Sequence, residues 1–218
     1  MSGAALVLDF GGVISRTLFE THADNEKALG VAPGTLDWFG PFKPESDTLW
    51  QQMQRDDITE RDYWHQRAQD VAALVGQTDW SMADMVQALR GNRPDSAIRP
   101  EARHAISEAK AAGHKLAILS NELDLFYGEG FAAELPLLEP FDVIVDATYT
   151  GILKPDPAAY AHCCEALGLP AQRCVFVDDQ ARNIAGGMTA GMNCVHFDVH
   201  HPGPSFQTAL DTLTSLQD

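Results

Sequence analysis

The strongest constraint on the fold is a contrast between two parts of the chain. Residues 4–9 and 98–218 alternate short apolar runs with helical patterns, whereas residues 16–95 carry helical patterns and no run typical of a strand. Strands that alternate with helices predict βαβ crossovers and a parallel sheet. We therefore predict an α/β fold: a doubly wound parallel, Rossmann-like core of residues 1–15 and 96–218, with an all-helical cap domain inserted at residues 16–95.

Five short runs are predicted to form the strands of the core. Nearly every position in them is apolar, as expected for parallel strands that are covered on both faces. The strands are predicted at Ala4–Leu8, Lys115–Leu119, Asp142–Val145, Cys174–Val177 and Cys194–Phe197. Proline at the first helical position and glycine just past the last are typical helix boundaries. Core helices are predicted at Pro100–Ala112, Pro157–Leu167, Ala181–Ala190 and Phe206–Leu216.

The inserted segment is predicted to contain four helices separated by glycine and proline. They are predicted at Leu18–Leu29, Asp47–Arg55, Glu60–Val75 and Ser81–Leu89, with Thr59 as an N-cap. The segment also contains all four tryptophans of the chain, Trp38, Trp50, Trp64 and Trp80. Aromatic residues at such spacing pack into a core more often than they line a ligand cleft, so we expect a core role.

Charge and cysteine content limit the partners and the compartment. With 15 Lys and Arg against 31 Asp and Glu, the net charge is −16, which argues against a nucleic-acid partner or an anionic membrane. The longest apolar runs are far shorter than a membrane span, and no basic residue precedes the first of them, so we expect no secretory signal and a cytoplasmic protein. The four cysteines lack a metal or disulfide spacing and are expected to be reduced thiols. We expect a monomer or homodimer.

Polar residues follow four of the predicted strands and loops, where an open parallel sheet binds its ligands. They are Asp9, the pair Ser120–Asn121, Lys154 and the pair Asp178–Asp179. Each is unremarkable alone, since such residues often cap helices or lie in turns. Together, however, they predict three carboxylates, a hydroxyl and an ammonium group at one edge of the sheet.

Three carboxylates at one site favour a bound cation. Like charges at short range raise one another's pKa, and a divalent ion relieves that repulsion. Oxygen ligands without His or Cys indicate Mg²⁺ rather than a softer metal. Mg²⁺ in turn favours a phosphorylated substrate, and Gly11–Gly12, which begins two residues after Asp9, permits close approach of main-chain amides to a phosphate.

These residues carry a resemblance to a known family. The segments Asp9-Phe10-Gly11-Gly12-Val13, Leu119-Ser120-Asn121, Thr150 to Asp156 and Phe176-Val177-Asp178-Asp179, with Asn183 and Ala190-Gly191-Met192, resemble the four motifs of the haloacid dehalogenase superfamily of hydrolases. The motifs span residues 9–192. Within that superfamily the chain is most similar to the group with a helical cap, which includes sugar-phosphate phosphatases and the phosphatase domain of soluble epoxide hydrolase.

The resemblance implies a Mg²⁺-dependent phosphatase of small phosphorylated metabolites and a role for each matching residue. Asp9 would be the nucleophile that forms an aspartyl-phosphate, Ser120 would bind the phosphoryl group, and Lys154 would bridge the two. Gly12 and Asn121 would also contact the substrate. The implied Mg²⁺ ligands are Asp9, Asp178, Asp179 and the main-chain carbonyl of Gly11, with Asn183 in support.

One position departs from the family pattern. Most phosphatases of the superfamily carry a second aspartate two residues after the nucleophile as a general acid and base, and here that residue is Gly11. Among residues of the cap, Glu20 or His22 are candidates to replace it, although a surface role on the first cap helix is the stronger interpretation of both. A water molecule or a good leaving group is another way to compensate.

Two alternative functions remain open. A metal-independent 2-haloacid dehalogenase would use Asp9 to displace halide from carbon, but such enzymes usually carry an aromatic residue in place of Gly11, and the Asp178–Asp179 pair suits a cation. A non-catalytic phosphometabolite-binding protein would keep the same residues without turnover. We favour the phosphatase because it accounts for more of them.

Overall fold

The computed structural model describes residues 3–90 and 94–216. The chain divides into two compact units. The core unit comprises Met1–Arg16, Ile98–Asp124 and Gly130–Asp218, and the helical unit comprises Thr17–Ala97 and Leu125–Glu129. The sequence interpretation had assigned residues 125–129 to the core, whereas their contacts are with the inserted helices.

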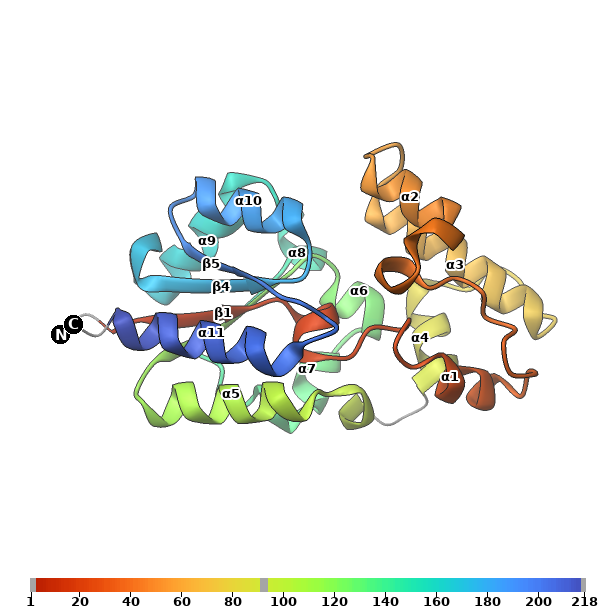
Figure 1. Cartoon of the computed structure of the whole chain (residues 1–218), viewed down its shortest axis with the longest axis horizontal. Coiled ribbons are helices and arrows are strands. Elements are labelled where there is room, and N and C mark those ends of the chain that lie inside the picture. Colours follow the sequence, from red (N-terminus) through yellow and green to blue (C-terminus); the bar gives the residue numbers. More distant parts are fainter. Residues whose placement is uncertain (1–2, 91–93, 217–218) are drawn as a thin grey trace. The chain divides into compact units, whose positions relative to one another are not determined.

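The core unit is built on a parallel sheet, which confirms the predicted α/β fold (Figure 1). Its strands are β1 (Ala5–Leu8), β2 (Lys115–Ser120), β3 (Val143–Asp146), β4 (Cys174–Asp178) and β5 (Asn193–His196). They lie in the order β3-β2-β1-β4-β5, and every neighbouring pair is parallel. The predicted boundaries agree within one residue, because each strand is recognisable from its apolar run.

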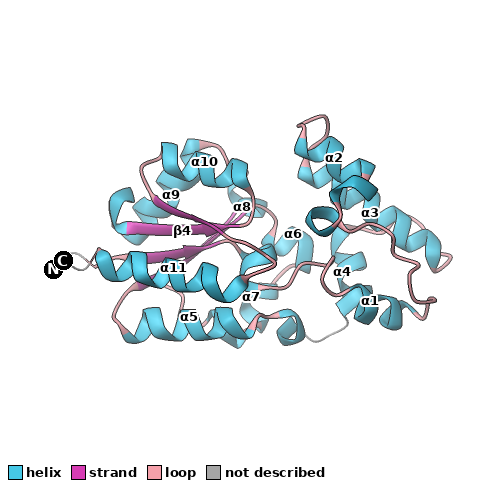
Figure 2. Ribbon diagram, in the orientation of Figure 1, coloured by secondary structure: helices cyan, strands magenta, loops and turns pink. Residues whose placement is uncertain are grey.

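Helices cover both faces of this sheet (Figure 2). The helices of the core unit are α5 (Pro100–Ala111), α7 (Phe131–Glu134), α8 (Ala147–Thr150), α9 (Pro157–Leu167), α10 (Ala181–Thr189) and α11 (Pro202–Ser215), and α6 (Leu123–Tyr127) begins in this unit. Helices α5 and α11 pack together on one face, and α9 and α10 on the other. On that second face the core contains Val7, Leu119, Tyr160 and Phe176, all at most 1% exposed.

The register of the strands aligns their carboxyl ends. Leu8 is paired with Ile118 of β2 and with Val177 of β4. The pairing of β1 with β4 continues one residue further, because the main-chain N–H of Asp9 donates to the carbonyl of Val177 at 2.9 Å. Asp9 and Asp178 therefore lie side by side at the carboxyl ends of the adjacent strands β1 and β4. Strand β2 is the other neighbour of β1, so its carboxyl end also lies beside Asp9.

The helical unit contains α1 (His22–Leu29), α2 (Thr48–Gln54), α3 (Glu60–Leu74) and α4 (Met82–Arg90). Thr59 caps α3 as predicted, in a reciprocal capping box with Asp62. The tryptophans also pack as predicted: Trp38 is buried, and Trp50, Trp64 and Trp80 pack against the same apolar cluster. Short 3-10 helices occur in the two units at Gly40–Phe42, Pro44–Ser46, Pro94–Ala97, Pro136–Leu138 and Ala171–Arg173.

Two predicted helix starts were wrong. Helix α1 begins at His22 and not at Leu18, because the preceding turn is closed by Glu20, whose carboxylate accepts from the Thr17 N–H at 2.8 Å. Helix α11 begins at Pro202 and not at Phe206. Pro202 and Pro204 are compatible with the first turn of this helix, because the N–H that proline lacks has no partner there.

The remaining structural expectations concern thiols and membranes. Cys163, Cys164 and Cys174 are buried and Cys194 is half-buried, and all four are free, as predicted. In the described ranges, 3–90 and 94–216, every helix is too short or too polar to cross a bilayer.

Candidate active site

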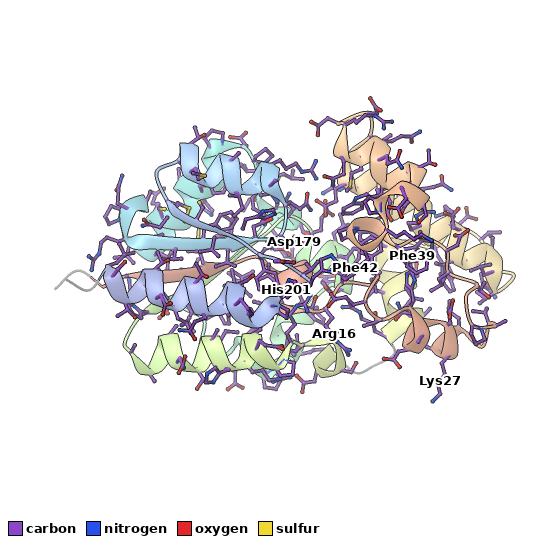
Figure 3. The ribbon with its side chains drawn as sticks, in the orientation of Figure 1. Arg16, Lys27, Phe39, Phe42, Asp179 and His201 are labelled. Atoms are coloured by element: carbon purple, nitrogen blue, oxygen red, sulfur yellow. The ribbon has the colours of Figure 1, made fainter. Side chains whose placement is uncertain are left out.

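Three carboxylates converge at the carboxyl edge of the sheet. Asp9 follows β1, Asp178 ends β4, and Asp179 comes directly after it (Asp179 is labelled in Figure 3). One carboxylate oxygen from each lies within 4.8 Å of the other two. Asp9 and Asp178 are buried, whereas Asp179 is partly exposed. The structure therefore brings together the three acidic residues that the sequence singled out.

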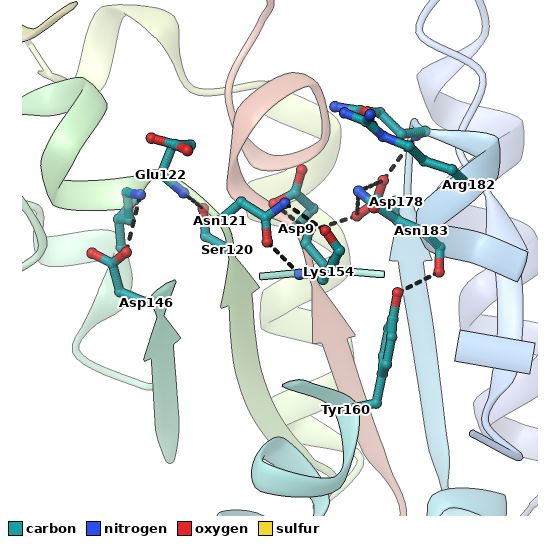
Figure 4. Close-up of polar contacts among 12 residues, drawn as sticks. Asp9, Ser120, Asn121, Glu122, Asp146, Lys154, Tyr160, Asp178, Arg182 and Asn183 are labelled. Atoms are coloured by element: carbon teal, nitrogen blue, oxygen red, sulfur yellow. Dashed lines mark hydrogen bonds and ion pairs between the residues drawn. The ribbon is translucent and has the colours of Figure 1, made fainter. Parts of the chain in front are cut away.

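Lys154 bridges two of these carboxylates (Figure 4). Its Nζ lies 2.9 Å from Oδ1 of Asp9 and 2.6 Å from Oδ2 of Asp178. The ammonium group is buried, and burial by itself lowers a lysine pKa. Here the charges of Asp178 and Asp9 outweigh burial and raise the pKa of Lys154, so it carries a fixed positive charge.

Hydrogen bonds to Asp178 and Lys154 hold this pair in place. Asn183 Nδ2 donates to both oxygens of Asp178 at 3.1 Å, and the Gln180 N–H donates to Oδ1 at 2.8 Å. On the other side, Asn121 accepts from the main-chain N–H of Lys154 at 2.7 Å and donates to its carbonyl at 3.1 Å. Asp178 thus has donors on both oxygens, and Asn121 fixes the backbone that carries the ammonium group.

Burial and charge make Asp9 the titratable member of the cluster. Burial raises its pKa to about 7, the nearby Lys154 opposes that rise, and the charge of Asp178 adds to it. Three ionised carboxylates beside one ammonium group leave the site with two uncompensated negative charges. Without another cation, ionising Asp9 near neutral pH is therefore costly.

A tight turn at Phe10–Ile14 follows Asp9 and lies against Asp179. Gly12 has φ of +79°, a left-handed conformation that favours glycine, and a Cβ at this position would lie 2.9 Å from Cγ of Asp179. Gly11 is different: its φ and ψ of −69° and 127° suit any residue, and a Cβ there would meet no atom within 4 Å. Only Gly12 is therefore required to be glycine by the geometry.

Ser120 and Asn183 occupy the flanks of the cluster. Ser120 is the last residue of β2, is buried, and precedes the Asn121 that contacts Lys154. Asn183 lies in α10, and its carbonyl accepts a hydrogen bond from the hydroxyl of Tyr160 at 2.7 Å. This role of Tyr160 was not predicted, because the residue lies on the apolar face of α9 and resembles an ordinary core residue.

The donor set of this cluster fits a hard divalent cation. The groups are carboxylate oxygens, the charge excess is negative, and Asp179 keeps part of its surface open. Oxygen ligands of this kind suit Mg²⁺, which keeps some of its water ligands when bound to a protein. The carbonyl of Gly11, in an exposed part of the turn, is a further oxygen donor of the same loop.

The two cap residues considered as a substitute general acid are not surface residues of a first helix. Glu20 precedes α1 and accepts from the N–H and hydroxyl of Thr17. His22 is buried beside the rings of Trp38 and Phe39 (Phe39 is labelled in Figure 3), and burial lowers its pKa. Neither ring nitrogen of His22 has a hydrogen-bond partner among the described residues. The predicted surface role was therefore wrong for His22.

One further residue near the nucleophile loop escaped the sequence analysis. Arg99, just before α5, is 3% exposed and donates from Nε and Nη2 to the carbonyl of Gly12. An arginine before a proline that begins a helix resembles an ordinary exposed residue. The contact joins positions 87 residues apart, so local sequence gives no indication of it.

Comparison with known proteins gives the family. A family model described as haloacid dehalogenase-like hydrolase matches residues 4–191. Phosphatase MT3486 from Mycobacterium tuberculosis is 35% identical over 117 residues, which are 54% of this chain and 53% of that protein. The chain therefore matches about half the length of that relative.

A dehalogenase is similar over more of the chain than phosphatase MT3486 is. (S)-2-haloacid dehalogenase 4A from Burkholderia cepacia is 27% identical over 169 residues, 74% of this chain and 73% of that protein. A crystal structure of a dehalogenase superposes with a TM-score of 0.61 at 21% identity, covering 99% of this chain and 96% of that chain. At that identity the superposition establishes the fold and not the reaction.

Proposed function

Because the chain belongs to the haloacid dehalogenase-like hydrolases, we propose that it is a magnesium-dependent phosphatase that hydrolyses small phosphomonoesters through an aspartyl-phosphate on Asp9. The observation that carries this proposal is the cluster of three carboxylates, within 4.8 Å of one another, around a single lysine. Its excess negative charge suits a divalent cation, which a phosphate group also binds, whereas displacement of halide from carbon by a carboxylate requires no metal ion.

The reaction divides into two displacements. In the first, a carboxylate oxygen of Asp9 attacks phosphorus, the new O–P bond forms, and the ester P–O bond breaks; the leaving oxygen takes a proton from solvent and departs as the alcohol. In the second, water attacks the same phosphorus, the bond to Asp9 breaks, and inorganic phosphate leaves with the oxygen from water. The carboxylate of Asp9 is regenerated, and the proton lost by water passes to solvent.

The neighbouring residues supply charge and orientation. Asp178 and Asn121 hold Lys154 in place. Its ammonium group forms an ion pair with the carboxylate of Asp9 and orients that carboxylate for attack. Ser120, at the end of β2, and the main chain at Gly12 would hydrogen-bond the phosphoryl oxygens. These contacts stabilise the charge that develops on the transferring group.

Magnesium fits the oxygen donors present. The carboxylates of Asp9, Asp178 and Asp179 and the carbonyl of Gly11 would hold it. When bound, it supplies the positive charge that lowers repulsion between the Asp9 carboxylate and a phosphate dianion. Since Asp178 already accepts hydrogen bonds on both oxygens, it also serves to fix Lys154.

Gly11 narrows the substrate class. A carboxylic acid at this position would protonate the leaving alcohol, and a general acid of this kind contributes about 10² to 10⁴ in rate. Glycine offers no such group, so we propose that the preferred substrates have good leaving groups, as a sugar-1-phosphate does. Among small phosphorylated metabolites, we therefore expect those whose alcohol is a good leaving group to be hydrolysed fastest.

Dehalogenation of a 2-haloacid is the second candidate function. The observation that favours it is the similarity of this chain to the Burkholderia cepacia dehalogenase. In that reaction Asp9 would attack carbon and expel halide without a metal ion. The carboxylate pair Asp178–Asp179 favours the phosphatase, because a metal-free site gains nothing from a third carboxylate.

Hydrolysis of p-nitrophenyl phosphate and of 2-chloropropionate tests these alternatives. We expect the purified wild type to release phosphate in Mg²⁺ and not in EDTA, and the Asp9→Asn variant to be inactive. Equal hydrolysis by wild type and Asp9→Asn would refute the proposal. Chloride release in EDTA, with no phosphate release in Mg²⁺, would assign the dehalogenase function. Mg²⁺-dependent binding of phosphate without turnover would indicate a binding protein.

A further inference from the structure

Arg99 lies where the chain re-enters the core unit after the helical insertion. Ile98, directly before it, forms an antiparallel bridge with Ser15, and the main-chain N–H of Arg99 donates to the carbonyl of Ile14 at 3.0 Å. The outgoing and returning segments are therefore joined at Arg99. Its side chain is nevertheless turned inward and is 3% exposed.

The guanidinium group of Arg99 holds the loop that follows Asp9. Nε and Nη2 donate to the carbonyl of Gly12 at 3.1 and 3.0 Å. Hydrogen bonds from a charged donor are stronger than those between neutral groups. The guanidinium carbon also lies 5.6 Å from the centre of the Phe197 ring, a cation–π distance. The Phe197 ring thus helps to orient the Arg99 side chain toward the carbonyl of Gly12.

The same glycine lies against a carboxylate of the cluster. A Cβ on Gly12 would lie 2.9 Å from Cγ of Asp179, so the backbone is already in close contact with that side chain. Gly12 also lies three residues after Asp9 in a tight turn. A displacement of the Gly12 carbonyl therefore changes the separation between the nucleophile loop and Asp179.

We propose that Arg99 is a positioning residue that holds the nucleophile loop against Asp179 and thereby sets the affinity of the carboxylate cluster for Mg²⁺. Arg99 acts on the cluster through its hydrogen bonds to the carbonyl of Gly12. The consequence for catalysis rests on the proposed function, but the consequence for metal binding does not. Partners that orient metal ligands typically change metal affinity by about 10- to 100-fold when they are removed.

A purely structural role for Arg99 makes a different prediction. If its side-chain hydrogen bonds to the carbonyl of Gly12 only stabilise the fold, their loss lowers the unfolding temperature and the yield of folded protein. The folded fraction would then bind Mg²⁺ with the wild-type dissociation constant. Measuring the dissociation constant on folded protein therefore separates the two roles.

The test uses Arg99→Met, Arg99→Lys and a control on the helix that follows, α5. Methionine keeps the contact with Phe197 but cannot donate to Gly12, whereas lysine keeps the charge and one donor group. Arg103 lies on the exposed side of α5, so Arg103→Met serves as the matched control. Titration calorimetry with MgCl₂ on the full chain gives the dissociation constant, and circular dichroism verifies the fold.

We expect Arg99→Met to raise the Mg²⁺ dissociation constant by about 10- to 100-fold. Arg99→Lys should give an intermediate value, and Arg103→Met the wild-type value. With p-nitrophenyl phosphate, the Mg²⁺ concentration for half-maximal rate should rise by the same factor, while kcat at saturating Mg²⁺ is largely recovered.

Several results would overturn the proposal. Folded Arg99→Met could bind Mg²⁺ with the wild-type dissociation constant, or Arg103→Met could show as large a rise in that constant as Arg99→Met. Failure of the wild type to bind Mg²⁺ would also overturn it. If Arg99→Met does not fold, a wild-type constant in Arg99→Lys overturns it equally. If the shifts appear but no variant or wild type hydrolyses phosphate esters, the positioning role stands and the proposed phosphatase function fails.

Discussion

Replacing Asp9 by asparagine (Asp9→Asn) is expected to stabilise the metal-free protein while abolishing turnover. The substitution preserves the shape of the side chain and removes its charge. In the absence of a divalent ion the folded protein must hold an ionised Asp9 beside Asp178, in a buried position where Lys154 compensates only part of the charge. Asparagine avoids that cost, so the gain in stability measures the electrostatic strain of the empty cluster.

The magnitude follows from the pKa of Asp9. Burial, opposed by Lys154, raises it from 3.8 to about 7, and each unit corresponds to 1.36 kcal/mol, so the penalty is about 4 kcal/mol when the group is fully ionised. The folded protein binds this proton more tightly than the unfolded chain does. The penalty is therefore absent below about pH 4, grows as the pH rises to about 7, and is complete above that value.

Urea unfolding in EDTA, followed by far-UV circular dichroism, is the suitable assay. Tryptophan fluorescence is less suitable, because all four tryptophans lie in the helical unit and Asp9 lies in the core unit. We expect the free energy of unfolding of Asp9→Asn to exceed that of the wild type by about 2 kcal/mol at pH 5 and by about 4 kcal/mol at pH 8. The control Asp211→Asn, on the exposed side of α11, should change stability by less than about 0.5 kcal/mol.

The pH dependence is the part of this prediction that can fail most clearly. A gain that is the same at pH 5 and pH 8, or a wild type that is the more stable protein at pH 8, would refute the electrostatic reasoning. Adding Mg²⁺ provides an independent check. At 100 times the dissociation constant it should stabilise the wild type by about 3 kcal/mol, and Asp9→Asn, which lacks one anionic ligand, by less.

Three further substitutions test other parts of the account. Lys154→Met leaves two buried carboxylates without their cation and should cost about 3–5 kcal/mol in urea unfolding at pH 8 in EDTA; wild-type stability would contradict this. Gly11→Asp is compatible with the backbone and meets no atom, so it should raise the hydrolysis of alkyl phosphates by about 10². It should leave p-nitrophenyl phosphate, whose leaving group needs no proton, little changed, and an equal effect on both substrates would exclude a general-acid role. Tyr63→Phe removes a hydrogen bond of 2.8 Å to the buried Asp47 carboxylate and should destabilise the helical unit by about 2 kcal/mol. Tryptophan fluorescence reports on that unit, and a loss below about 0.5 kcal/mol would show that the bond is dispensable.

The core fold was predictable because its signal is local. Each strand is apolar at nearly every position, and strands that alternate with helices usually form a parallel sheet. The strand ends then coincide, since Leu8 pairs with both Ile118 and Val177. The approach of Asp9 to Asp178 and Lys154 could therefore be anticipated from the sequence. The three-dimensional structure adds the distances and the hydrogen bonds that fix them.

The features that were not predicted depend on contacts between distant residues. Arg99 is buried because it meets a carbonyl 87 positions away, and His22 is buried because it packs against aromatic residues of its unit. Helices α6, α7 and α8 have only four or five residues, too few for a periodic pattern. Residues 125–129 belong with the inserted helices only through their packing.

The most direct test of the account is to trap the phosphorylated protein. The wild type is mixed with p-nitrophenyl phosphate carrying ³²P in Mg²⁺, quenched in acid within one turnover, and digested for mass spectrometry. We predict a hydroxylamine-sensitive acyl phosphate on the peptide that contains Asp9, present in Mg²⁺ and absent in EDTA and in Asp9→Asn. Turnover with no labelled peptide, or a label on any other residue, would contradict the assignment of Asp9 as the nucleophile.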